Sequence, residues 1–299
     1  MRSNLPDRER IESGSSVPGE LAQAIDRARP RLGRLASPLL FFETVGSTND
    51  VVLSRSAKAS AERCAHAERG SAHHSGERPE GLVVVAGEQT SGRGRRGHTW
   101  FSPPGSGLYV SVALAPAASA IDPSRATTLL TLAAGVALAE GIERATGLRV
   151  DLKWPNDLQV SRRKLGGILA ESSGPGAAID TVVVGYGLNL MPSAFPTELR
   201  DRTTSLESEL GRAVDRHQVL VETLVALSRR YEDLLASRFD AILDAWRRLA
   251  AGATGARVAW TSNAGTATGV TAGIDDLGAL LVRVDGRVER MVSGEVTWL

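Results

Sequence analysis

The ten residues Glu88-Gln89-Thr90-Ser91-Gly92-Arg93-Gly94-Arg95-Arg96-Gly97 follow a valine-rich run at 82–86 that is typical of a strand. The part from Gly92 to Gly97 fits G-x-G-x-x-G, the fingerprint of dinucleotide-binding folds. That fingerprint must open a helix packed in a βαβ unit, whereas here two prolines, at 103 and 104, follow it. The sequence therefore argues against a Rossmann fold.

The same loop predicts an anion-binding site. Its three glycines let the backbone bend and present N–H donors, and its three arginines supply planar guanidinium groups suited to phosphate or carboxylate. A loop rich in glycine is costly to order, so we expect it to be mobile when empty and to close over a polyanion. A basic targeting or nucleic-acid patch is the alternative that the loop alone leaves open.

Three later segments also carry polar groups into apolar surroundings. Lys153-Trp154-Pro155-Asn156-Asp157 places a cation, an amide and a carboxylate at the end of an expected strand at 148–152, although proline, asparagine and aspartate are also common in plain turns. Lys164 opens the apolar segment 164–171, where a lysine indicates either an anionic partner or simply an exposed strand start. The glycines at 166 and 167 indicate close approach of a ligand or of another backbone. Gly185-Tyr186-Gly187-Leu188-Asn189 ends a strand with an amide, and a bulge would explain it equally well.

The bulk properties describe an ordinary globular protein. The 299 residues have a formal net charge of +1 and 42% hydrophobic residues, which argues against disorder and against a dedicated nucleic-acid binder. The single cysteine, Cys64, excludes an intrachain disulfide and a thiolate-rich zinc site. No apolar run reaches the roughly 18 residues needed to span a bilayer, and residues 1–12 are too charged for a secretory signal. We therefore expect a cytoplasmic protein without a membrane partner.

The order of patterns predicts three regions. Residues 1–37 are expected to be a flexible leader with a short helix at 18–28, ended by Pro30. Residues 38–252 alternate strands with helices expected at 123–146, 217–235 and 239–249. Another helix is expected to begin at Ser47 or Thr48, and residues 56–80 are expected to form its end and then a mobile loop. Residues 253–299 read as short strands at 258–260, 267–272, 279–284, 288–291 and 295–298, which indicates a small β-barrel domain.

Taken together and in this order, the segments resemble the catalytic domain of biotin protein ligases. The matching pieces are Ser47-Thr48-Asn49, residues 88–97 with Trp100, residues 153–157, residues 164–169 with Glu171, and residues 185–189. The resemblance covers roughly residues 39–299. It implies an α+β fold of the class II synthetase-like type, with a mixed β-sheet and helices, and a small C-terminal SH3-like β-barrel. It also implies a monofunctional ligase, because the leader is too short for the DNA-binding domain of repressor-type members.

The resemblance assigns roles to the polar residues. The residues implied to bind biotin are Ser47, Thr48, Asn49, Gln89, Gly92, Arg93, Gly94, Arg95, Lys164 and Gly167. Those implied to bind ATP and the adenylate are Arg95, Arg96, Trp100, Lys153, Asn156, Asp157 and Asn189. Chemistry supports a catalytic part of this set: two anionic reactants must meet, so Arg95, Lys153 and Lys164 would offset their repulsion, and Asp157 would act as a base or orienting group. No metal site on the protein is expected, since Mg²⁺ would be carried by the ATP phosphates.

The implied activity is ATP-dependent formation of biotinyl-5′-AMP and transfer of biotin to a lysine of a biotin carboxyl carrier protein domain, by a monomer or weak homodimer that does not bind DNA. Two alternatives remain. A lipoate-type ligase shares the fold and the adenylate chemistry, but the apolar lipoyl group would not need Ser47, Thr48, Asn49 and Gln89 together. A non-enzymatic biotin or nucleotide sensor would release no pyrophosphate.

Overall fold

A seven-stranded mixed sheet forms the centre of the chain. The computed structural model describes residues 15–68, 79–118, 121–173, 181–192, 195–262 and 265–299. The strand order is β1-β2-β3-β7-β6-β5-β4, in which β1 and β2 run parallel and the other neighbours antiparallel. The strands are β1 (Leu39–Val45), β2 (Val83–Gln89), β3 (Gly107–Leu114), β4 (Asp151–Lys153), β5 (Asp157–Val160), β6 (Arg163–Ser173) and β7 (Thr181–Asn189). The predicted α+β class with a mixed sheet is confirmed.

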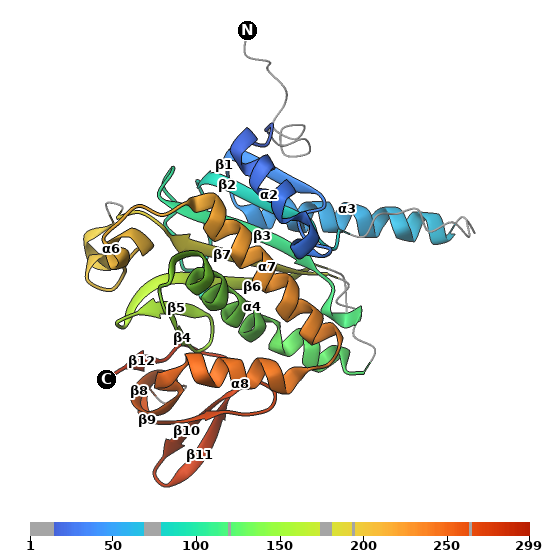
Figure 1. The fold of residues 1–299 in the computed structure, drawn as a ribbon. Helices are drawn as coiled ribbons and strands as arrows, with labels where there is room; N and C mark the ends of the chain where they lie inside the picture. Colours follow the sequence, from blue (N-terminus) through green and yellow to red (C-terminus); the bar gives the residue numbers. More distant parts are fainter. Residues whose placement is uncertain (1–14, 69–78, 119–120, 174–180, 193–194, 263–264) are drawn as a thin grey trace.

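Helices cover one face of this sheet and bury its main core (Figure 1). They are α2 (Gly19–Leu32), α4 (Pro123–Thr146), α7 (Arg216–Leu235) and α8 (Phe239–Leu249), and the last three match the predicted helices within one residue at each end. Asp122 caps α4 by accepting a hydrogen bond from the Arg125 backbone N–H. By length and composition α4 could cross a membrane, but most of it is buried inside the protein, as in the core helix of a soluble protein.

The opposite face is covered by α3 (Thr48–Glu68), which packs against β2, β3, β6 and β7. The helix end predicted within 56–80 is confirmed, since α3 continues to Glu68, and the predicted mobile loop falls largely on 69–78, which lie outside the described residues. Alanine, lysine, glutamate and arginine are frequent after residue 56, and these residues favour a helix even where few apolar side chains are available for packing. The start of α3 is the part that faces the functional site.

The predicted flexible leader is wrong for the part that the structure describes, residues 15–37. Helix α2 buries Leu21, Ile25, Ala28 and Leu32 against the core at i, i+4, i+7 and i+11. Pro30 lies in the last turn of α2 and does not end it earlier. The helix predicted at 18–28 is therefore present as α2, but the charged residues between its apolar positions hid that it packs against the core.

The C-terminal region forms a separate five-stranded antiparallel sheet in the order β11-β10-β9-β8-β12. Its strands are β8 (Thr254–Ser262), β9 (Gly265–Ile274), β10 (Leu280–Val284), β11 (Arg287–Met291) and β12 (Thr297–Trp298). All five predicted strand positions are confirmed, and Asp285 and Gly286 turn with positive φ as the Asp-Gly pair predicts. Val258, Leu280 and Val282 belong to the main core, so the two sheets are packed on shared side chains.

Candidate functional site

A cavity of about 580 Å³ lies on the α3 face of the main sheet, and segments from both sheets line it. Of the sixteen residues predicted for the site, one, Gly92, does not line the cavity. A Cβ at Gly92 would lie 2.5 Å from the Trp100 carbonyl oxygen, so the missing side chain lets the loop close on itself. The predicted residues that do line the cavity are Ser47, Thr48, Asn49, Gln89, Arg93, Gly94, Arg95, Arg96, Trp100, Lys153, Asn156, Asp157, Lys164, Gly167 and Asn189.

One end of the cavity is built from uncharged polar groups. The Thr48 backbone N–H donates to Gln89 Oε1 at 2.9 Å, and the Thr48 hydroxyl lies 3.1 Å from the same oxygen. Ser111 Oγ lies 2.7 Å from Thr48 Oγ1 and 2.5 Å from Asn49 Oδ1. Thr48, Asn49 and Ser111 are each less than 5% exposed, so these groups are held in place and can recognise a neutral polar ligand group by hydrogen bonds.

Strand glycines make room for this end and for the indole of Trp100. A Cβ at Gly185 would lie 2.1 Å from Asn49 Oδ1, and a Cβ at Gly187 would lie 2.2 Å from Trp100 Nε1. The Trp100 indole also lies 3.4 Å from the Cβ position of Gly167, so it packs against two neighbouring strands. Its Nε1 is buried without a hydrogen-bond partner among the described residues. A bulge is therefore not needed to explain these glycines, which are required by close approach of side chains.

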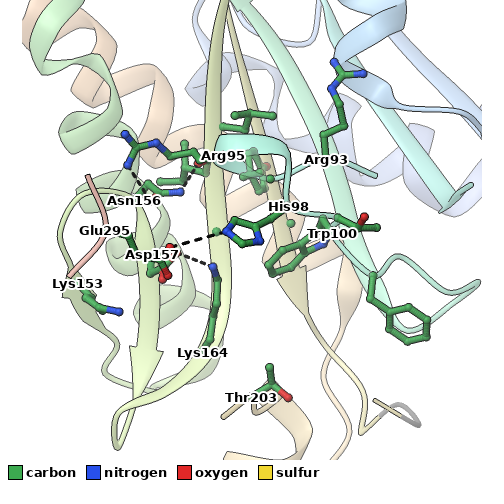
Figure 2. A pocket seen from close by; sticks show the side chains of 18 of the residues that line it. Arg93, Arg95, His98, Trp100, Lys153, Asn156, Asp157, Lys164, Thr203 and Glu295 are labelled. Carbon is green, nitrogen blue, oxygen red and sulfur yellow. Dashed lines mark hydrogen bonds and ion pairs between the residues drawn. The ribbon is translucent and has the colours of Figure 1, made fainter. Parts of the chain in front are cut away.

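The other end of the cavity is charged. Lys164 Nζ lies 2.6 Å from Asp157 Oδ1 and 5.6 Å from the centre of the Trp100 ring (Figure 2). The Arg95 guanidinium donates to Asn156 Oδ1 at 3.4 Å and to the Gly294 carbonyl oxygen at 3.5 Å. The proximity of Lys164 and Asp157 follows from the β5–β6 hairpin, in which Ser161 and Arg162 turn with positive φ.

Burial destabilises the charged forms of two cations at this end. Burial lowers the pKa of Lys153, an effect that the nearby Asp157 carboxylate opposes. Burial and the neighbouring Arg96 charge lower the pKa of Arg95. A bound anion would relieve both costs. Lysine and arginine side chains lining the cavity number seven, against three carboxylates, among the residues that the structure describes.

Arg93 lies apart from the other arginines of the loop. Its guanidinium is 2.6 Å from Asp50 on α3 and 3.0 Å from Glu171 on β6, and Figure 2 shows it well away from Arg95. These contacts raise the pKa of Arg93 despite partial burial. In this structure Arg93 therefore anchors the loop to the sheet, whereas Arg95 is directed toward Asn156.

Sequence reasoning missed several residues of the site. Ser111 could have been found, because it is the one serine or threonine in the apolar strand segment 108–114. Glu171 was recognised as part of a motif but given no role. The cavity residues Gly294, Glu295, Thr297 and Trp298 come from the C-terminal sheet, and no sequence signal places them there.

These features define a class of protein before any comparison is made. The site suits a ligand with a neutral hydrogen-bonding group at one end and negative charge at the other, on a fold with no Rossmann topology. An enzyme that joins an acid to a nucleotide phosphate meets this description.

Comparison with known proteins identifies the family. Residues 69–189 match the Biotin/lipoate A/B protein ligase family. The chain is 38% identical over 220 residues to the "Bifunctional ligase/repressor BirA" of Bacillus subtilis, covering 73% of this chain but 66%, just under two thirds, of that relative. It is 36% identical to the "Biotin--[acetyl-CoA-carboxylase] ligase" of Paracoccus denitrificans, covering 67% of this chain and 83% of that relative.

Solved structures agree with the sequence comparison. The biotin protein ligase from Aquifex aeolicus in complex with biotin and ATP superposes with a TM-score of 0.69 at 26% identity, covering 87% of this chain and 98% of that one. The chain therefore belongs to the biotin protein ligases of the biotin/lipoate A/B protein ligase family.

Proposed function

We propose that this protein activates biotin with ATP to biotinyl-5′-AMP and then transfers biotin to a lysine of a biotin carboxyl carrier protein domain. The observation that carries the proposal is the polarity of one cavity, with neutral hydrogen-bonding groups at one end and a cation excess at the other. Biotin has the same polarity, since its ureido ring is neutral and its valeryl chain ends in a carboxylate. The solved structure of the Aquifex aeolicus relative is a complex with biotin and ATP.

In the first step, a biotin carboxylate oxygen attacks the α-phosphorus of ATP and pyrophosphate leaves. Both reactants are anions, so the side chains must reduce their repulsion and hold them in line. Lys164, Lys153 and Arg95 are the cations at the charged end, and the lowered pKa values of Lys153 and Arg95 show that these cations lack an anionic partner of their own strong enough to offset burial. We assign charge stabilisation to these three residues.

In the second step, the carrier lysine attacks the acyl carbon of the mixed anhydride. An amide bond forms, the acyl–phosphate bond breaks, AMP leaves, and the amine gives up a proton. Asp157 is a carboxylate at the charged end, but it is paired with Lys164 at 2.6 Å. We therefore propose that Asp157 orients Lys164 in the first step and accepts or directs the amine proton only after Lys164 engages the adenylate.

A magnesium ion in this reaction would be carried by the ATP phosphates. Among the described residues, no group of three or more histidine, cysteine, aspartate or glutamate side chains could hold a metal. The ion would supply charge neutralisation on the phosphates, while the protein contributes its own cations.

The direct test is ATP- and biotin-dependent labelling of a purified carrier domain, followed with pyrophosphate release. We expect both signals, each dependent on biotin. Pyrophosphate release without labelling would support only the first step. The absence of both signals would indicate a sensor. Calorimetric titration with biotin and lipoate separates the remaining alternative, because tight lipoate binding with no biotin binding would assign a lipoate-type ligase.

A further inference from the structure

Glu171 lies directly behind the polar end of the cavity and has no role in the reaction described above. It is on β6, in alternation with Gly167 and Leu169, which line the cavity. Its carboxylate accepts hydrogen bonds from Asn49 Nδ2 at 2.6 Å and from Arg93 Nη2 at 3.0 Å. A carboxylate can only accept, and both partners here are donors.

This contact fixes which way the Asn49 amide points. Asn49 is 4% exposed, and its two polar atoms face different neighbours. With Nδ2 on Glu171, Oδ1 faces Ser111 Oγ at 2.5 Å. The reversed amide would place its oxygen against the carboxylate, an arrangement with no hydrogen between two acceptors. Glu171 therefore makes Asn49 present an acceptor to Ser111.

The orientation of Asn49 then decides where the hydroxyl protons go. Ser111 is fully buried and has one hydroxyl proton, which can serve only one of its two short contacts. Asn49 Oδ1 has no proton to share, so the Ser111 proton goes to it. The Thr48 hydroxyl, 2.7 Å away, then satisfies its contact with Ser111 by donating to Ser111 Oγ.

The free end of this chain faces the ligand. Once the Thr48 proton is directed toward Ser111, the Thr48 hydroxyl no longer donates to Gln89 Oε1, 3.1 Å away, and that oxygen keeps only the Thr48 backbone N–H as its donor. Thr48 and Gln89 both line the cavity, so a ligand N–H placed between their two oxygens would supply the missing hydrogen. Gln89 is held in this orientation because its Nε2 donates to Ser102 Oγ at 3.0 Å. A pair of fixed acceptors recognises an N–H donor and disfavours an oxygen in the same place.

We infer that Glu171 is a positioning residue that sets the donor–acceptor polarity of the pocket through Asn49, Ser111 and Thr48, and so selects a ligand that presents ureido N–H groups. The inference rests on the proposed function, because it assumes biotin as the ligand. It adds a specificity role for a residue that is not itself among those lining the cavity.

A purely electrostatic role through Arg93 would look similar if only Glu171 were changed. Asp50 provides a matched control, because its carboxylate also pairs with Arg93, at 2.6 Å, and is more exposed than that of Glu171. The Asn49 amide donates to Glu171 and not to Asp50. Asp50→Asn removes one negative charge from Arg93 and leaves the chain from Glu171 to Thr48 intact.

The experiment compares binding of biotin with binding of two isosteric carbamate analogues, in each of which one ureido N–H is replaced by oxygen. Calorimetry on the full chain gives the ratio of biotin affinity to the affinity of the more weakly bound analogue. In the unaltered protein we expect a ratio of about 100, because the analogue leaves a buried acceptor unpaired. Glu171→Met, which keeps the side-chain size but removes the acceptor, should reduce this ratio at least about fivefold.

Rescue by a conservative change separates hydrogen bonding from charge. Glu171→Gln keeps an acceptor oxygen, which both donor partners hold in place, so its ratio should stay within about threefold of the unaltered protein. Asp50→Asn should stay within about twofold. Ser111→Ala interrupts the same chain and should lose discrimination as Glu171→Met does, which provides a second variant should Glu171→Met fold poorly. The apparent affinity for ATP should change little in all four variants.

Two results would overturn this inference and leave the proposed function intact. One is an unchanged affinity ratio in both Glu171→Met and Ser111→Ala. The other is a loss of that ratio in Asp50→Asn as large as in Glu171→Met. The unaltered protein is titrated first. If it binds no biotin, the proposed function fails, and the inference that rests on it fails as well. The two failures are therefore distinguishable.

Discussion

Replacing Lys164 with methionine should slow biotin adenylation strongly while leaving the fold intact. The Lys164 ammonium lies at the charged end of the cavity, 2.6 Å from Asp157. The substitution removes a cation that offsets the repulsion between the two reactants, and it also leaves Asp157 without its ion-pair partner. Both effects act against an anionic transition state.

The expected loss of rate is estimated from the interaction between the Lys164 charge and a negative charge on the reactants. Two unit charges about 4 Å apart in an effective dielectric of about 20 interact by about 4 kcal/mol, which sets an upper limit of about 1,000-fold on the rate. The Lys164 side chain is 34% exposed, so solvent screens part of this interaction. Halving the figure for screening gives about 2 kcal/mol, or about 30-fold. We therefore expect a loss between these two values in kcat/KM for adenylation.

The assay is pyrophosphate release under single-turnover conditions, with the melting temperature measured in parallel. Arg163→Met is the matched control, since Arg163 is the preceding residue but pairs with Glu209 and does not line the cavity. Its rate should stay within about twofold. Adding Asp157→Asn to Lys164→Met should recover part of the ATP affinity by removing the unpaired carboxylate, without restoring kcat. Wild-type pyrophosphate release in Lys164→Met would refute the assigned role.

Three further outcomes are expected. Arg95→Ala should speed release of biotinyl-adenylate at least about tenfold with a change in melting temperature of only about 2 °C, measured by adenylate trapping and thermal unfolding; unchanged release would count against the role of Arg95. Gly185→Ala places a Cβ 2.1 Å from Asn49 Oδ1, so it should cost about 1–3 kcal/mol of stability and raise the KM for biotin more than the KM for ATP, and an unaltered biotin KM would contradict the packing argument. Burial lowers the pKa of Lys153, and bound phosphates would raise that pKa again. ATP should therefore bind with its highest affinity at pH values below the pKa of Lys153 in the free protein. The affinity should fall as the pH rises through that pKa. Titrations between about pH 7 and about pH 10 should show this fall, and Lys153→Met should show a weaker but flatter profile; the same slope in both proteins would exclude Lys153 as its source.

The local elements and the chemistry of the main loop were determined by the sequence itself. Helices α4, α7 and α8 have strong apolar periodicity together with start and stop signals, and the C-terminal strands are separated by turn residues, so both follow from local patterns. Residues 88–97, 153–157 and 164–171 contain cations and glycines whose use in an apolar setting requires a ligand or a close contact. The resemblance of these segments to one family then fixed the fold. Where the local pattern was diluted by charged residues, as in α2, the sequence predicted a helix but not that the helix packs against the core.

Only the tertiary structure decided how distant residues act together. Asn49 meets Glu171 across 122 positions of sequence and Ser111 across 62, because β3, β6 and α3 converge on β7 in the sheet. The segment between β11 and β12 contributes Gly294 and Glu295 to the cavity, because the C-terminal sheet packs on the main core. The strength of a hydrogen bond or an ion pair depends on distance and burial, and neither is a property of local sequence. The sequence therefore named most residues of the site, and the fold assigned their partners.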